Sequence, residues 1–174
     1  MGLLDGKSIV FFAEEMYEDL ELWYPKIRLT EEGARTVVAA PEARVYRGKN
    51  GYPVKADISL NDVRVNEYDA LIIPGGYAPD KLRRYTKTLE ITRQMFDEHK
   101  VVAFICHAGW VPISARILKG KKATSVRAIK DDMENAGALW EDKSVVVDGN
   151  LISSRTPEDL PDFCKAIIKA LAGD

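Results

Sequence analysis

The sequence predicts a three-layer α/β sandwich with a mostly parallel central sheet. Short β-rich runs alternate with helical patterns along the chain, and the first four of these runs are continuously apolar. Continuous apolar runs are typical of parallel strands that helices bury on both faces, whereas half-exposed strands alternate apolar and polar residues. The alternation of such strands with helices therefore indicates one sheet between two helical layers.

The six runs expected to form strands are 8–12, 36–40, 70–73, 101–105, 144–147 and 151–153. Turn residues at 148–150 separate the last two runs, which predicts a hairpin at the end of the sheet. Residues 43–56 contain Gly48, Asn50 and Gly51 and are a candidate for a second hairpin.

The helices expected between and after these strands are 19–32, 89–99, 109–118, 129–136 and 157–171. Gly33 is expected to end the first helix. The last helix has a defined start, because Thr156 can cap it and Pro157 fits the first helical position. Glu158 and Asp159 then favour the positive end of the helix dipole.

Length and composition indicate a single domain, residues 1–174, with no linker, repeat or low-complexity segment. The formal net charge of −2 is spread along the chain, which argues against nucleic acid or an anionic membrane surface as a partner. The first residues contain no secretion signal and no segment is apolar enough to span a bilayer, so a cytosolic protein is expected.

Cys106 is the predicted nucleophile. It directly follows the apolar run 101–105, and residues 107–110 open a helical pattern, so its thiol is expected at the carboxyl end of a central strand. Open α/β sheets bind ligands at that edge, and a sharp strand-to-helix turn would expose the thiol there. The positive end of the following helix is expected to lower the thiol pKa.

The other cysteine and the two histidines are distinguished by their neighbours. Cys164 lies in an amphipathic helical pattern, so packing explains it. His99 ends a polar helix and is expected to be solvated. His107 is therefore the candidate partner of the thiol, as base or ion-pair partner.

Glycines and acids at the same predicted edge complete the candidate site. Gly75, Gly76 and His107 are candidate oxyanion- or substrate-binding residues, because both glycines follow the third apolar run and the N–H of Gly76 together with that of His107 could receive an oxyanion. Five acids cluster after the first strand, Glu14, Glu15, Glu18, Asp19 and Glu21, and spacing alone does not select one of them as the proton partner of the thiol.

Five segments together resemble the PfpI-type intracellular protease branch of the DJ-1/PfpI superfamily: 17–21 (YEDLE), 69–80 (DALIIPGGYAPD), 105–108 (ICHA), 129–133 (IKDDM) and 146–157 (VVDGNLISSRTP). The resemblance covers nearly the whole chain. It implies a flavodoxin-like sandwich with the cysteine at a nucleophile elbow. No cofactor and no metal is implied.

The resemblance also assigns roles to single residues. It implies that the Glu18 carboxyl hydrogen-bonds the Cys106 thiol, and that an acid from a neighbouring subunit orients His107. The matching acid is Asp80, one methylene shorter than the glutamate that some members carry. A homo-oligomer, either a dimer or a hexamer, is therefore expected.

Two functions remain open from the sequence. One is a cysteine-dependent enzyme acting on a peptide, a small carbonyl compound such as methylglyoxal, or a glycated amine. The other is a redox-sensing stress-response chaperone with an oxidisable Cys106. A class I glutamine amidotransferase is excluded, because Phe104 and Ala108 occupy its usual glycine positions and no histidine follows His107.

Overall fold

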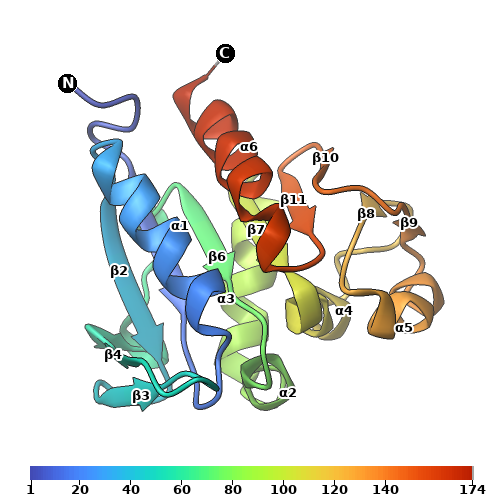
Figure 1. Ribbon diagram of the computed structural model, residues 1–174, viewed down its shortest axis with the longest axis horizontal. Coiled ribbons are helices and arrows are strands. Elements are labelled where there is room, and N and C mark those ends of the chain that lie inside the picture. Colours follow the sequence, from blue (N-terminus) through green and yellow to red (C-terminus); the bar gives the residue numbers. More distant parts are fainter. Residues whose placement is uncertain (174) are drawn as a thin grey trace.

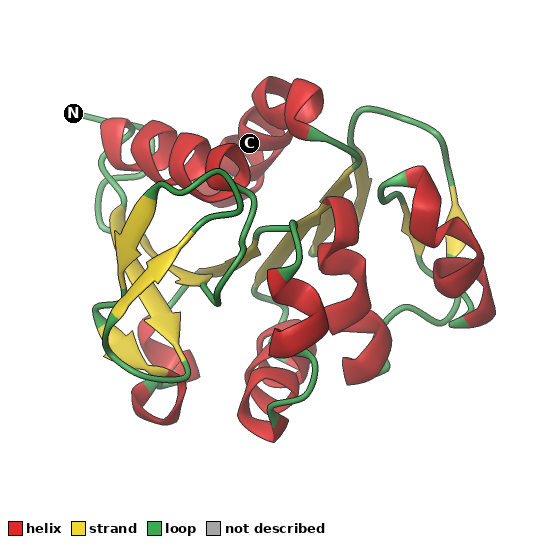
Figure 2. Cartoon of the chain, turned by 60° about the horizontal axis from the view of Figure 1, so that its bottom comes forward, coloured by secondary structure: helices red, strands yellow, loops and turns green. Residues whose placement is uncertain are grey.

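The computed structural model describes residues 1–173 and contains a seven-stranded sheet between two layers of helices (Figures 1 and 2). The sheet consists of β1 (Ser8–Phe12), β2 (Arg35–Ala40), β5 (Ile58–Ser59), β6 (Ala70–Ile73), β7 (Val101–Ile105), β10 (Val146–Asp148) and β11 (Leu151–Ser154). Their order is β10-β11-β7-β6-β1-β2-β5. The pairing is parallel except between β10 and β11, which form the expected hairpin.

The five longer parallel strands have the flavodoxin-like order. In space they run β2-β1-β6-β7-β11, which corresponds to the order 2-1-3-4-5. The chain therefore changes direction across the sheet between β1 and β6, and ligands bind beside such a switch point at the carboxyl ends of the strands. The predicted three-layer sandwich with a mostly parallel sheet is confirmed.

Helices cover both faces of the sheet. The α-helices are α1 (Asp19–Glu31), α2 (Ala78–Leu82), α3 (Thr86–Asp97), α4 (Trp110–Ala115), α5 (Lys130–Asn135) and α6 (Leu160–Ala172). Helices α1 and α6 pack against each other on one face, and α3 contacts β6, β7 and α4 on the other (Figure 2). Short 3₁₀ turns lie at 60–62, 65–67, 106–109, 127–129 and 157–159.

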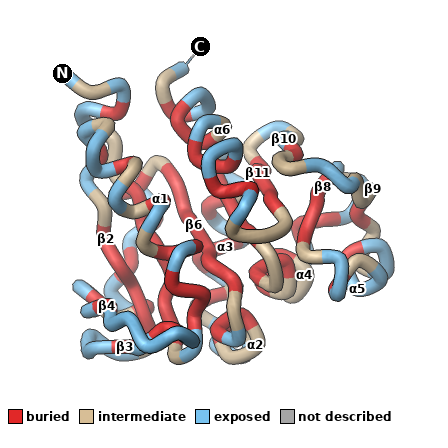
Figure 3. Tube along the Cα trace, viewed as in Figure 1, coloured by how far each residue is buried: buried red, intermediate tan, exposed pale blue. Residues whose placement is uncertain are grey.

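The core follows the apolar runs of the sequence. Every residue of β6 and β7 is buried, and the strand cores stand out from the exposed hairpin in Figure 3. Cys164 on α6 is 2% exposed and packs in this core, which confirms its structural role. Two small sheets lie outside: β3 (Val45–Arg47) with β4 (Pro53–Lys55), and β8 (Lys122–Ala123) with β9 (Leu139–Trp140).

Several boundaries differ from the predicted ones. The helix expected at 109–118 begins as a 3₁₀ turn at Cys106 and ends at Ala115, because Arg116 adopts a left-handed conformation with φ 60°. The helix expected at 157–171 also opens with a 3₁₀ turn, and the Thr156 side chain makes no capping hydrogen bond there. Helix α2 and strands β5, β8 and β9 were not predicted, because a helix of five residues is under two turns long and strands of two residues leave no recognisable apolar run.

The burial of β6 leads to a stability prediction. Ile72 is 0% exposed in this central strand, so Ile72→Ala is expected to reduce the free energy of unfolding by about 2–5 kcal/mol. Val147 on edge strand β10 is 52% exposed, and Val147→Ala is a control expected to cost under about 1 kcal/mol. Urea denaturation of both variants tests this, and equal losses would contradict the assignment of the core.

Candidate active site

Cys106 lies at the carboxyl end of β7, where the chain turns sharply into α4. Its backbone φ is 62°, in the left-handed region that residues other than glycine seldom adopt. The preceding strand is fully buried, so this turn is held in place by packing on both faces of the sheet. Such a conformation is typical of a nucleophile presented at an elbow.

The thiol is partly buried and surrounded by hydrogen-bonding groups. Cys106 Sγ lies 3.4 Å from Nδ1 of His107. The backbone N–H groups of His107 and Gly76 also face the sulfur and favour its charged form. The ring of His107 packs against Trp110, with ring centroids 5.2 Å apart, so the imidazole has a defined orientation. The structure therefore brings together three of the predicted groups.

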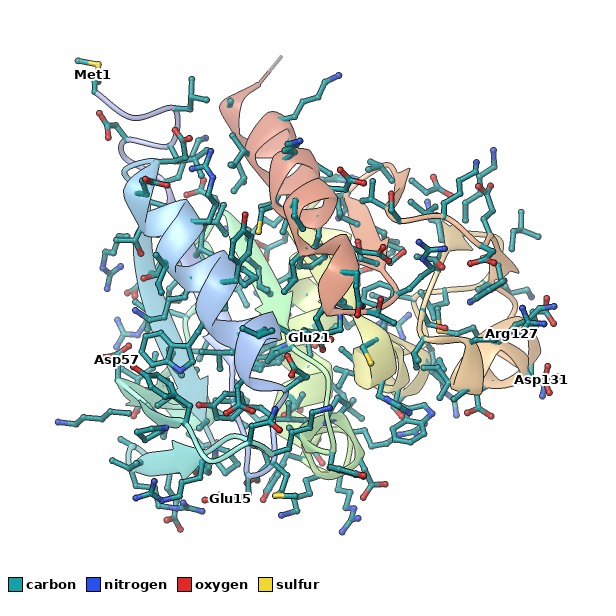
Figure 4. The ribbon with its side chains drawn as sticks, in the orientation of Figure 1. Met1, Glu15, Glu21, Asp57, Arg127 and Asp131 are labelled. Atoms are coloured by element: carbon teal, nitrogen blue, oxygen red, sulfur yellow. The ribbon has the colours of Figure 1, made fainter. Side chains whose placement is uncertain are left out.

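The carboxyl group beside the thiol is that of Glu21, not Glu18. A Cβ atom at Gly75 would lie 2.5 Å from Oε1 of Glu21 and 2.8 Å from Cβ of Cys106, so these two side chains approach the same point. Glu21 is 0% exposed and lies beside the first turn of α1, on the side facing the middle of the molecule (Figure 4). The Glu18 carboxylate was expected to hydrogen-bond the Cys106 thiol. It instead accepts a hydrogen bond from the N–H of Glu21 (2.9 Å).

The start of α1 explains this arrangement. Glu18 is the N-cap of the helix and Glu21 is its third residue, the spacing of a capping box. In that motif the second side chain usually returns to the N-cap N–H, but here the Glu18 N–H donates to the carbonyl oxygen of Gly75 (3.0 Å). The Glu21 side chain instead turns inward and accepts from the Gly75 N–H (2.9 Å).

The glycine pair has two separate tasks. The N–H of Gly75 is occupied by Glu21, so this group does not contribute to the predicted oxyanion hole. Gly76 has φ 81° and packs so tightly on the 16–18 segment that a Cβ would lie 2.5 Å from the backbone N of Glu18. Its N–H is directed at the sulfur, as expected for an oxyanion donor.

Burial dominates the electrostatics of the site. It raises the pKa of the Glu21 carboxyl to about 8, with a further increase from the charge of Glu18. Burial, and secondarily the charge that Glu21 acquires on ionisation, raises the pKa of the Cys106 thiol to about 12. The expectation of a lowered thiol pKa is therefore wrong for the isolated chain at rest. Burial lowers the pKa of His107, so its imidazole is neutral near pH 7.

Asp80 and His99 do not touch the thiol. Asp80 lies on the surface in α2 and pairs with Arg84 of its own chain. His99 is exposed at the far end of β7, before the strand begins, as expected for a solvated histidine. A cavity of about 610 Å³ is lined by Trp110, Arg83, Arg116 and Lys119 among others. Cys106 is not part of this lining, so the thiol lies outside the cavity.

Residues 1–173 contain neither a metal-binding cluster nor a membrane-spanning helix. No group of three or more His, Cys, Asp or Glu side chains in this range is arranged to hold a metal ion. No helix in the same range is long and apolar enough to cross a membrane.

Comparison with known proteins identifies the family of this chain. The family model described as the DJ-1/PfpI family matches residues 7–170. The chain belongs to the DJ-1/PfpI family. It is 48% identical over 164 residues to Deglycase PfpI of Pyrococcus furiosus, covering 94% of this chain and 99% of that relative.

Two further members show the breadth of this DJ-1/PfpI family. The putative cysteine protease YraA of Bacillus subtilis is 38% identical over 168 residues, covering 95% of this chain and 99% of the relative. The crystal structure of Drosophila melanogaster DJ-1beta superimposes with a TM-score of 0.91 at 26% identity, covering 100% of this chain and 92% of that one. The resemblance inferred from the five sequence segments is confirmed at the level of the family.

The raised pKa of Glu21 predicts a pH-dependent stability. An unfolded glutamate loses its proton near the ordinary value of 4.5, whereas the folded chain keeps it to about pH 8. The contribution of Glu21 to stability is therefore complete below about pH 4.5 and is lost as the pH rises to about 8. Glu21→Gln removes this titration and is expected to gain on the order of a few kcal/mol over the wild type toward pH 8.

Urea denaturation from about pH 5 to about pH 8 measures this difference. Glu67→Gln is the matched control, because Glu67 is exposed and the substitution removes the same charge from the surface. Parallel stability curves for the wild type and Glu21→Gln would contradict the assignment of a protonated buried carboxyl.

Proposed function

We propose that this protein is a cysteine-dependent enzyme that acts on carbonyl carbons, with glycated amines as the favoured substrates. The observation that carries the proposal is the left-handed Cys106 with its sulfur 3.4 Å from Nδ1 of His107, beside the buried carboxyl of Glu21. The 48% identity to a protein named a deglycase favours glycated amines over peptides, and the relative named a putative cysteine protease supports cysteine chemistry.

The first step is addition of the sulfur to the carbonyl carbon. The thiol is protonated at rest, and neutral His107 accepts its proton at Nδ1 as the sulfur–carbon bond forms. The electron pair of the C=O bond moves to oxygen, and the N–H groups of Gly76 and His107 are donors for the negative charge.

Where the carbonyl carbon itself bears nitrogen, as in a peptide, the C–N bond breaks as the C=O bond re-forms, His107 gives the proton to the nitrogen, and water hydrolyses the resulting thioester. In a glycated amine the nitrogen lies on a carbinol carbon, and there the S–C bond forms as the C–N bond breaks, with His107 passing the thiol proton to the amine. The C–S bond of that hemithioacetal then breaks, its hydroxyl becomes the carbonyl of the released aldehyde, and the hydroxyl proton returns through His107 to the sulfur.

The Glu21 carboxyl supports this step while it is protonated. Its Oε1 accepts from Gly75, and its Oε2 is buried without a hydrogen-bond partner among the described residues. A proton on Oε2 can be donated to the sulfur or to the substrate oxygen as negative charge develops. A charged Glu21 would instead repel that charge, so its raised pKa serves the reaction.

The third member of the triad is proposed to come from another subunit. Asp80 is partly exposed in α2, pairs there with Arg84 and does not contact His107 within its own chain, so it would reach the His107 of a neighbouring copy by exchanging its Arg84 partner. A two-fold symmetric contact would place one Asp80 at each of two sites. The enzyme would then be active only as a homo-oligomer, dimeric or hexameric.

A redox sensor is the second candidate function. Cys106 is partly exposed whereas Cys164 is 2% exposed, which would make oxidation selective for Cys106. The raised thiol pKa leaves little thiolate at rest, which slows direct oxidation of Cys106, whereas in the proposed enzyme His107 removes the proton as the sulfur attacks. Mass spectrometry after mild peroxide separates the two, because a pure sensor oxidises at Cys106 yet turns over none of the substrates.

The nucleophile is tested with Cys106→Ala. Turnover of methylglyoxal, a glycated amino acid and a fluorogenic peptide is compared with the wild type, and a loss of at least about a thousandfold is expected on the true substrate. Cys164→Ala removes the buried thiol and is the matched control, expected to keep its activity. Undiminished turnover by purified Cys106→Ala, free of metal and contaminants, would contradict the proposal.

The contribution of Asp80 is tested by complementation. Asp80→Ala is expected to reduce kcat by about 100-fold or more while Cys106 and the fold remain intact. Mixing inactive Cys106→Ala subunits with Asp80→Ala subunits, followed by dissociation and reassembly, should restore part of the activity, since one site of a mixed pair then has both groups. No recovery in oligomers shown to be mixed would contradict a site completed by two chains.

A further inference from the structure

The tip of the β3–β4 hairpin, residues 48–52, is fastened to the start of α1 by Asp19. The Asp19 carboxylate accepts hydrogen bonds from the backbone N–H of Asn50 (2.9 Å), its side-chain amide (3.2 Å) and the N–H of Tyr52 (2.9 Å). Gly48 packs so closely on this carboxylate that a Cβ would lie 2.4 Å from Cγ of Asp19. An otherwise exposed hairpin therefore has a fixed tip.

Lys49 lies at this tip, next to the segment that covers the thiol. Its N–H donates to the carbonyl oxygen of Tyr17 (2.8 Å), and Tyr17 forms an antiparallel bridge with Gly76. Gly76 in turn presents its N–H to the sulfur of Cys106. Paired backbone segments lie about 5 Å apart, so only the Tyr17 segment separates Lys49 from Gly76. The flexible four-carbon stem of a lysine can span such a separation.

The charge of Lys49 acts on every ionisable group of the site. Its positive charge acts to lower the pKa of Cys106, Glu21 and His107, although burial has the larger effect on each, as expected for a lysine whose backbone lies one paired segment away from Gly76. Lys49 is exposed, and none of the ion pairs within residues 1–173 includes it. The thiol and the Glu21 carboxyl are neutral at rest, so they do not neutralise this positive charge.

We propose that Lys49 is a specificity-determining residue that binds a carboxylate group of the substrate beside the Cys106 thiol. The inference rests on the proposed function and specifies its substrate class. It indicates carbonyl adducts that carry a carboxylate a few bonds from the reacting carbon, such as the adduct of an oxoaldehyde with a free amino acid. Adducts on internal side chains of a protein lack that carboxylate and would be poorer substrates.

The first experiment does not depend on turnover. Alkylation of Cys106 by iodoacetate, which is anionic, is compared with alkylation by the neutral iodoacetamide, and mass spectrometry follows the modified cysteine. Lys49→Gln is expected to lower the iodoacetate-to-iodoacetamide rate ratio by about fivefold, and Lys49→Arg is expected to keep most of it. Lys55→Gln, an exposed lysine of the same hairpin, is the charge-matched control and should leave the ratio unchanged.

The second experiment measures substrate preference. The adducts of methylglyoxal with the amino groups of alanine and of alanine amide are both glycated amines and differ by one carboxylate charge. The wild type is expected to have the higher kcat/KM for the carboxylate, and Lys49→Gln should reduce the ratio between the two substrates by about fivefold, mainly through KM. Added salt should reduce the wild-type ratio in the same direction.

The outcomes separate the two proposals. If the alkylation ratio falls in Lys49→Gln but the wild type turns over neither adduct, Lys49 selects anions and the proposed function fails. If the wild type turns over both adducts and Lys49→Gln loses both equally, Lys49 acts on the thiol and the specificity proposal is overturned. Equal alkylation ratios in Lys49→Gln, Lys55→Gln and the wild type overturn it as well.

Discussion

The geometry of the site depends on the backbone of one residue, Gly75, which lies where α1, β6 and β7 meet. Its N–H donates to Glu21, its carbonyl oxygen accepts from Glu18, and its α carbon faces Cys106. A Cβ atom there would lie 2.5 Å from the Glu21 carboxyl oxygen and 2.8 Å from the Cys106 Cβ, so no other residue fits without displacing one of them. The distance between the carboxyl and the sulfur is therefore determined by backbone packing.

The fold was largely predictable because buried parallel strands leave short, continuously apolar runs in the sequence. The runs that became β1, β6 and β7 are continuously apolar, and β7 and β6 are buried along their whole length. The position of Cys106 followed from the end of one such run, without knowledge of the turn. Helix α2 and the β8–β9 pair were not predictable in this way, because their formation depends on contacts distant in sequence and they are too short to show a period.

The resemblance did not distinguish Glu18 from Glu21, because one acid is the N-cap of α1, the other lies in its first turn, and their side chains point in different directions. Their spacing did contain a usable signal. An acid at the N-cap of a helix accepts a hydrogen bond from the backbone N–H three residues later. This bond occupies the carboxylate of Glu18, whereas the carboxyl of Glu21 remains available for another contact. Whether Glu21 then turns inward depends on Gly75, which lies 54 residues away in sequence and was not accessible from local pattern.

The thiol pKa shows how two local effects compete. The start of a helix favours a thiolate, but here Cys106 opens a 3₁₀ turn followed by a helix of only six residues. Burial outweighs this contribution and keeps the thiol protonated. Because Glu21 is also neutral, neither of the two groups that flank the reacting carbon carries negative charge before substrate arrives, and in the proposed reaction charge develops there only as sulfur transfers its proton to His107. Lys49 then adds positive charge at the exposed rim, where an anionic substrate encounters it before reaching the buried groups.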